Sequence, residues 1–158
     1  MNFIIKVTNK RTAEVIKFDI PYIVISIYST NSQPAKIPLH PKCLDVLSIQ
    51  FDDVDSDDWQ IGCKSITEKQ ANQIWTFVDY YLQRNHTNPK LDNTKAELIL
   101  IHCNAGVCRS PALAAAISRI YTGEDKEWFQ KPYLPNMKVY NTMLKVELAQ
   151  EVNVLILT

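Results

Sequence analysis

Three short apolar runs in the first part of the chain predict β-strands. They read FIIKV, YIVISIY and DVLSIQF and cover residues 3–7, 22–28 and 45–51. Short runs that are rich in β-branched and aromatic residues are typical of strands. The third run ends in an acidic segment, FDDVDSDDW, residues 51–59. We therefore expect three strands, the last of which leads into a cluster of carboxylates.

After Thr67 the apolar residues recur at helical spacing. They are Ala71, Ile74, Trp75, Phe77, Val78, Tyr81 and Leu82. The preceding TEKQ places Thr67 three residues before Gln70, which is the arrangement of a capping box. We predict an amphipathic helix that begins here, with Trp75, Phe77 and Tyr81 in the core.

A polar loop separates this helix from a fourth apolar run. The loop reads RNHTNPKLDNTK, residues 84–95, and AELILI, residues 96–101, follows it. A continuous apolar run suits a central strand that is buried on both faces. The alanine-rich SPALAAAISRIY then predicts a helix packed closely on a sheet, with Ser110 as its N-cap and Pro111 as its first residue.

A third helix is predicted by PNMKVYNTMLKVELA, residues 135–149, with Asn136 as its cap. The last eight residues, EVNVLILT, fit either a strand or a tail. Alternation of strands and helices predicts an α/β fold. We expect residues 1–158 to form one domain with a mostly parallel central sheet of about four to five strands, flanked by helices.

The composition allows one packed core and excludes some classes of partner. The chain has 158 residues, of which 46% are hydrophobic and 22% are charged. Seventeen basic residues balance seventeen acidic ones, so no overall charge favours nucleic acid or a membrane surface. No apolar run approaches the ~18 residues of a membrane span, and MNFIIKV has no signal-peptide pattern. We expect a cytoplasmic protein.

The four cysteines are expected to be reduced, because a chain without a secretion signal meets a reducing environment. They are Cys43, Cys63, Cys103 and Cys108. No CxxC pair is present, so a structural zinc site is not predicted. Cys43 and Cys63 fit the pattern of small buried side chains. Cys103 is different, because it follows the apolar run at residues 96–101, where the predicted strand ends.

The segment HCNAGVCRS, residues 102–110, lies between a predicted strand and a predicted helix. In this arrangement backbone N–H groups converge on an anion, assisted by the helix dipole. Gly106 permits a sharp turn and a close approach to the ligand, and Arg109 offers a planar fork for two phosphate oxygens. Such surroundings lower the pKa of a thiol, so Cys103 is a candidate nucleophile.

This segment matches the pattern His-Cys-x5-Arg-Ser/Thr. The chain therefore resembles the cysteine-dependent protein tyrosine phosphatases of the compact dual-specificity branch, and over roughly residues 22–122 it resembles small microbial or viral predicted tyrosine phosphatases. The resemblance implies that Cys103 attacks phosphorus, that Ser110 assists departure of the thiolate, and that His102 helps to set the thiol pKa. The implied phosphate-binding residues are Asn104, Ala105, Gly106, Val107, Cys108 and Arg109. No metal or organic cofactor is implied.

The family also needs a general acid, an aspartate on a loop after an upstream strand. The candidates are Asp52, Asp53, Asp55, Asp57 and Asp58. When IQFDD is aligned with the family loop, the acid falls on Asp53, with Asp55 second and Asp52 third. The fifty positions from Asp53 to Cys103 exceed the usual separation. The insertions SDDWQIGCK and HTNPKLDNTK account for the excess, and Trp59 is either a pocket wall or an ordinary half-buried side chain.

We predict a phosphomonoester hydrolase that acts on phosphoprotein. Phosphotyrosine is the expected substrate, and phosphoserine and phosphothreonine are left open. The loop NAGVC contains no lysine or arginine, so it lacks the positive charge that a polyphosphorylated inositol ring requires. Two alternatives are a catalytically weak module that binds phosphoproteins and another thiol enzyme, such as an arsenate reductase or sulfurtransferase.

Cys108 suggests redox regulation. Oxidation of a low-pKa thiolate gives a sulfenic acid, which a nearby thiol can capture. We predict a reversible disulfide between Cys103 and Cys108 after peroxide treatment. The alternative is that Cys108 is only a small residue in the loop, since proximity in sequence does not ensure disulfide geometry.

Overall fold

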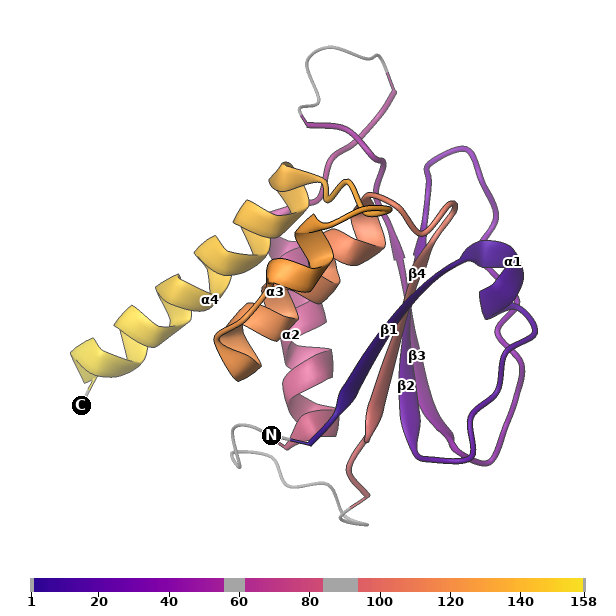
Figure 1. The fold of residues 1–158 in the computed structure, drawn as a ribbon. Coiled ribbons are helices and arrows are strands. Elements are labelled where there is room, and N and C mark those ends of the chain that lie inside the picture. Colours follow the sequence, from indigo (N-terminus) through magenta and orange to yellow (C-terminus); the bar gives the residue numbers. More distant parts are fainter. Residues whose placement is uncertain (1, 56–61, 84–93, 158) are drawn as a thin grey trace.

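The computed structural model describes residues 2–55, 62–83 and 94–157, and the remainder is drawn as a grey trace in Figure 1. The sequence-based candidates Asp57, Asp58 and Trp59 lie outside the described residues.

One parallel sheet forms the centre of the described structure. Its strands are β1 (Ile4–Asn9), β2 (Tyr22–Tyr28), β3 (Cys43–Gln50) and β4 (Leu98–Cys103). Their order across the sheet is β1-β4-β2-β3, and every neighbouring pair is parallel. All six residues of β4 are buried, as expected for the continuous apolar run that forms it. The predicted parallel sheet flanked by helices is confirmed.

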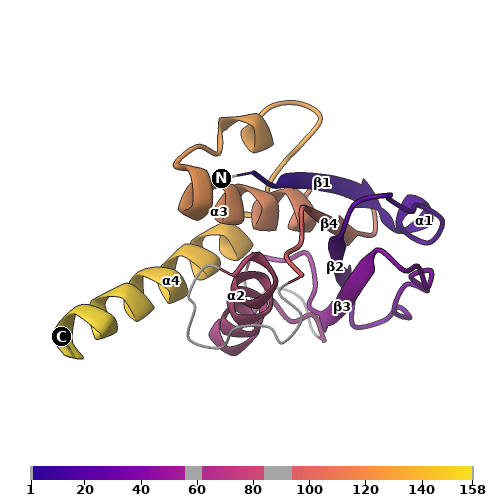
Figure 2. The same cartoon turned by 90° about the horizontal axis from the view of Figure 1, so that it is seen from below.

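The helices lie mainly on one face of this sheet. They are α1 (Lys10–Ala13), α2 (Glu68–Leu82), α3 (Arg109–Thr122), the 3-10 helix η1 (Lys126–Phe129) and α4 (Met137–Leu157). Figures 1 and 2 show α2, α3 and α4 together on one face, whereas α1 and the segment between β2 and β3 lie on the other. The carboxyl end of β4 therefore leads over the sheet edge into α3.

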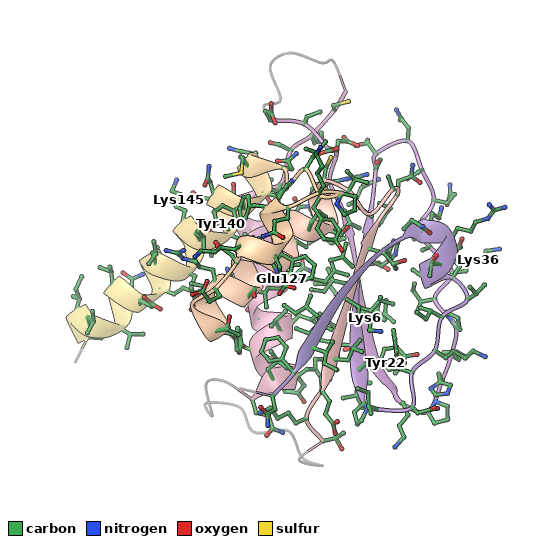
Figure 3. All side chains as sticks on the ribbon, in the orientation of Figure 1. Lys6, Tyr22, Lys36, Glu127, Tyr140 and Lys145 are labelled. Carbon is green, nitrogen blue, oxygen red and sulfur yellow. The ribbon has the colours of Figure 1, made fainter. Side chains whose placement is uncertain are left out.

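Each face of the sheet has its own apolar cluster. The larger lies under α2, α3 and α4 and contains Trp75, which is fully buried, with Phe77 and Tyr81 packed partly buried against it. The smaller cluster contains Tyr22. Figure 3 shows Tyr22 and Lys36 on the side of the sheet away from those helices. On α4, Lys145 pairs with Glu68 of α2 at 2.6 Å.

The helix starts test the capping predictions. The capping box of α2 is confirmed, because Thr67 Oγ1 accepts from the Gln70 amide and Gln70 Oε1 from the Thr67 amide, both at 3.1 Å. Asn136 caps α4, since its Oδ1 accepts from the Val139 amide at 3.1 Å. The predicted cap of α3 is wrong: Cys108 holds the N-cap position and Ser110 lies inside the helix. The Ser110 hydroxyl is instead 3.1 Å from Cys103 Sγ.

The structure also corrects the expectation for the C-terminal segment. α4 continues to Leu157, so this segment is neither a strand nor a tail. No glycine or proline follows Asn136, and the i to i−4 hydrogen bonds therefore continue without a break. The last turns expose apolar side chains, among them Leu155, which is 74% exposed. Among the described residues, no helix is both long and apolar enough to span a membrane.

Candidate active site

The loop between β4 and α3, residues 104–108, turns at Gly106, whose φ is +74°. A Cβ at this position would lie 2.7 Å from the carbonyl carbon and oxygen of Thr8, at the end of β1. The predicted sharp turn is therefore confirmed, and strand β1 lies close to this glycine. The Lys10 amide also donates to the Asn104 carbonyl at 3.1 Å, so β1 and α1 support the loop from behind.

Cys103 lies at the floor of this loop and is 2% exposed. Its Sγ accepts from the Gly106 amide at 3.2 Å and lies 3.1 Å from the Ser110 hydroxyl. Burial acts most strongly and raises the thiol pKa, but hydrogen bonds from the hydroxyl and amide of Ser110 and the amide of Gly106, together with the Arg109 charge, outweigh it. The net effect is a Cys103 pKa below its ordinary value, which favours the thiolate.

Arg109 is buried and its guanidinium is held by two protein acceptors. Nη1 donates to Ser29 Oγ at 2.9 Å and to the Phe51 carbonyl oxygen at 2.8 Å. Among the described residues Nε has no hydrogen-bond partner. A buried N–H without a partner is unfavourable, so an oxyanion that accepts from it would be stabilised here.

His102 is fully buried and supports the backbone of the nucleophile. Its Nδ1 lies 3.2 Å from the Cys103 carbonyl oxygen, which can only accept, so Nδ1 carries the hydrogen. Nε2 then accepts from the Ser26 hydroxyl at 2.6 Å. Burial lowers the His102 pKa and favours this neutral form. These two bonds reach Ser26 and the backbone of Cys103 rather than the thiol.

Asp52 is buried and fully engaged in holding loops together. It accepts from the Thr30 and Lys64 amides, each at 2.8 Å, and from the Thr30 hydroxyl. Burial has the largest effect and raises its pKa, but the hydrogen bonds from Thr30 and Lys64 and the charge of Arg109 lower it below the ordinary value overall. Asp52 is thus an ionised carboxylate that joins three segments of backbone.

Asp53 is exposed and lies beside the loop that holds Cys103. Its Oδ1 accepts from Asn136 Nδ2 at 2.7 Å. The side chain of Cys108 also hydrogen-bonds to Asp53, and burial together with this carboxylate raises the pKa of Cys108 to about 11. Asp53 and Asp55 border the same cavity of about 610 Å³, which Cys108 and Asn136 line as well. The structure therefore places two of the candidate acids on a cavity that Cys108 of the loop also lines.

All four cysteines are free thiols. At a pKa of about 11, Cys108 is almost entirely protonated near neutral pH, and a protonated thiol attacks a sulfenic acid slowly. The predicted disulfide between Cys103 and Cys108 stays a prediction.

Several supporting residues were not identified from the sequence. Ser26 was detectable, because it is the single polar residue in the run YIVISIY and a buried hydroxyl needs a partner. Ser29 and Thr30 follow β2 without any distinctive local pattern. Asn136 was recognised only as a helix cap. Within residues 2–55, 62–83 and 94–157, no group of three or more histidine, cysteine, aspartate or glutamate side chains is placed to hold a metal ion.

The fold matches solved structures, although no family model and no curated protein sequence matches the chain. The human tyrosine phosphatase-like serine/threonine/tyrosine-interacting protein aligns with a TM-score of 0.56 at 19% identity, over 98% of this chain and 93% of that one. Human DUSP28 aligns with a TM-score of 0.57 at 14% identity, over 94% of each chain. Tk-PTP in the active form gives a TM-score of 0.52 at 14% identity, over 92% of each. The chain has the fold of the compact dual-specificity-like tyrosine phosphatases.

Proposed function

We propose that residues 1–158 form a single-domain phosphomonoester hydrolase that acts on phosphoproteins through a phosphocysteine intermediate at Cys103. The observation that carries the proposal is the pairing of a thiol of lowered pKa with the buried guanidinium of Arg109 at the two ends of one loop. A thiolate beneath an anion site can attack phosphorus, and the resemblance of the fold to dual-specificity phosphatases supports this chemistry.

In the first step the phosphoryl group binds in the loop. The amides of residues 104–109 and the free Nε of Arg109 bind its oxygens. Cys103 Sγ forms a bond to phosphorus while the bond from phosphorus to the ester oxygen breaks. Asp53 transfers its proton to that oxygen, so the alcohol or phenol leaves in neutral form.

In the second step water hydrolyses the phosphocysteine. Asp53, now a carboxylate, accepts a proton from the attacking water, and the bond between sulfur and phosphorus breaks. The electron pair returns to Cys103 as a thiolate. The Ser110 hydroxyl, 3.1 Å from Sγ, stabilises this leaving group by donating a hydrogen bond. Inorganic phosphate is the product.

The charge around the loop favours a phosphorylated side chain over a polyphosphorylated ring. Residues 104–108 carry no lysine or arginine, and the carboxylate of Asp55 borders the adjacent cavity. This negative charge would repel additional phosphates. We expect phosphotyrosine to be accepted, with phosphoserine and phosphothreonine as further substrates of a dual-specificity enzyme.

A phosphoprotein-binding module is the second candidate. Its support is the likeness to a human protein described as phosphatase-like and interacting. This chain nevertheless contains the nucleophile Cys103, the anion ligand Arg109 and a nearby carboxylate, Asp53. The two candidates differ in whether a bound phosphopeptide is turned over.

Hydrolysis of 4-nitrophenyl phosphate in the presence of a chelator tests the proposal. We expect turnover that survives the chelator, is blocked by vanadate and is abolished in Cys103→Ser. Cys43→Ser is the matched control and should retain activity, because Cys43 lies on β3. Robust activity in Cys103→Ser would overturn the thiol mechanism. Phosphopeptide binding without turnover by the unmodified protein would support the binding module instead.

A further inference from the structure

Asn136 joins three segments that surround the candidate site, and its side chain is 7% exposed. Its backbone amide donates to the Cys108 carbonyl at 3.0 Å, and its Oδ1 caps α4 by accepting from the Val139 amide. Its Nδ2 donates to Asp53 Oδ1 at 2.7 Å and to the Val54 carbonyl at 3.4 Å. One residue therefore connects the phosphate loop, the acidic segment and the last helix.

Capping a helix does not explain this set of bonds. A cap needs only an acceptor, which serine or aspartate also supplies. Asn136 uses its Oδ1 for that purpose, and its Nδ2 donates to the acidic segment at Asp53 and Val54. An amide is the side-chain group that combines an acceptor with a two-hydrogen donor. The donor group of Asn136 is therefore not needed for the start of α4.

The bond to Asp53 limits how that exposed carboxylate can orient. Oδ1 accepts from Asn136, and the Cys108 side chain hydrogen-bonds to the same carboxyl group. The residues on either side of Asp53 are held as well. Asp52 accepts from the Thr30 and Lys64 amides, and the Val54 carbonyl accepts from Asn136. General-acid catalysis depends on the placement of the acid within hydrogen-bond reach of the leaving oxygen.

The same residue sets the acid relative to the nucleophile. The backbone amide of Asn136 donates to the Cys108 carbonyl, and its side chain donates to Asp53. Asn136 therefore binds both the carboxylate of Asp53 and the loop that precedes Arg109. We propose that Asn136 is the positioning residue of the general acid: its carboxamide holds Asp53 beside the phosphate loop. This inference rests on the proposed phosphatase function.

The test compares Asn136→Ser with the unmodified protein on two aryl phosphates. Serine keeps the cap of α4 but removes both amide donors. Phenyl phosphate has a poor leaving group that needs the acid, whereas 4-nitrophenyl phosphate has a good one. We expect kcat/KM, which does not include the later hydrolysis of the phosphocysteine, to fall roughly 10- to 100-fold for phenyl phosphate and less than about 3-fold for 4-nitrophenyl phosphate, because only part of the general-acid contribution is lost. The affinity for vanadate should be unchanged.

Two controls accompany this variant. Asn141→Ser removes an exposed amide from the same helix and cavity and should change neither rate. In the Asp53→Asn background, Asn136→Ser should add no further loss, because its effect passes through Asp53. The ratio of the two rates does not depend on how much of the protein is folded.

An equal loss on both substrates, or a loss that adds to that of Asp53→Asn, would show that Asn136 acts only on structure and would overturn the inference. Failure of the proposed function looks different, since the unmodified protein would then show no turnover that depends on Cys103.

Discussion

The guanidinium of Arg109 donates to the carbonyl oxygen of Phe51 at 2.8 Å, although 58 positions separate the two residues in the chain. Phe51 is the first residue of the acidic segment, so this bond links the loop that would bind phosphate to the segment that carries the candidate acids. The second acceptor of the same Nη1 is Ser29, just after β2. The orientation of Arg109 is thus decided by two loops at the carboxyl edge of the sheet.

Replacement of this guanidinium should be costly even when the charge is kept. In Arg109→Lys, one ammonium cannot reproduce both the bonds to Ser29 and Phe51 and the fork for phosphate. We expect kcat/KM for an aryl phosphate to fall about 100- to 1,000-fold, as for removal of a major oxyanion ligand. Arg119→Lys, on the exposed side of α3, should change it little. Comparable activity in the two variants would contradict a phosphate-binding role for Arg109.

The lowered pKa of Cys103 predicts its reactivity with iodoacetate. The thiolate is the reactive form, so alkylation should persist below the ordinary thiol pKa of about 8.5 and decline as the pH falls through the lowered value. Ser110→Ala removes one of the stabilising hydrogen bonds and should move this transition to higher pH. Mass spectrometry that locates the alkylated cysteine can measure the rate of reaction at Cys103 at each pH.

Cys43 provides the comparison within the same protein, because burial raises the pKa of its thiol. It should react more slowly than Cys103 near neutral pH. If both thiols titrate together, or Ser110→Ala leaves the transition in place, the site does not stabilise the thiolate.

Two glycines with similar φ values separate backbone strain from close packing. Gly106 and Gly123 have φ of +74° and +82°. A Cβ at Gly106 would lie 2.7 Å from backbone atoms of Thr8, whereas a Cβ at Gly123 would have no such neighbour. Gly123→Ala should cost about 1–2 kcal/mol of unfolding free energy, which is the penalty for an alanine in the left-handed region. Gly106→Ala should cost more and should also weaken vanadate binding, because the loop must move from β1. Equal losses in urea unfolding would contradict the contact.

Asp52 should stabilise the fold in a pH-dependent manner. Its folded-state pKa is lowered, so its stabilisation is present above the unfolded value of about 3.9 and is lost as the pH falls through the folded value. Asp52→Asn should lower the free energy of unfolding near neutral pH by about 2 kcal/mol or more, since it breaks hydrogen bonds to a buried charge. The variant should then lose less additional stability in acid than the unmodified protein.

Urea unfolding at several pH values measures both effects. The control Asp19→Asn changes an exposed carboxylate and should leave the curve unaltered. Identical pH dependence in Asp52→Asn and the unmodified protein would show that this carboxylate does not contribute in the manner described.

The sequence by itself determined the elements whose signals are local. Four apolar runs became the strands, the TEKQ segment became a capping box, and HCNAGVCRS contains the end of a strand, a loop and the start of a helix. These predictions succeed because side-chain periodicity and capping depend on neighbours within a few positions. For the same reason the position of Cys103 and Arg109 at the two ends of one loop could be read directly from their spacing.

Local signals were insufficient where a side chain had two competing uses. Ser110 has the chemistry of a cap, but its hydroxyl contacts Cys103 instead, and the helix starts at Arg109. The apolar C-terminal residues resembled a strand, yet they continue α4 because nothing in the chain interrupts its hydrogen bonds.

Only the tertiary structure distinguished the two adjacent carboxylates. Asp52 and Asp53 are the same residue type and both follow the end of β3 at Gln50, so no local pattern separates them. The first is buried against Thr30 and Lys64, and the second faces the cavity and meets Asn136, 83 positions away. Contacts over such separations depend on which strands become neighbours in the sheet, and no spacing within the sequence encodes them, because they arise only when the chain packs into its order of β1-β4-β2-β3.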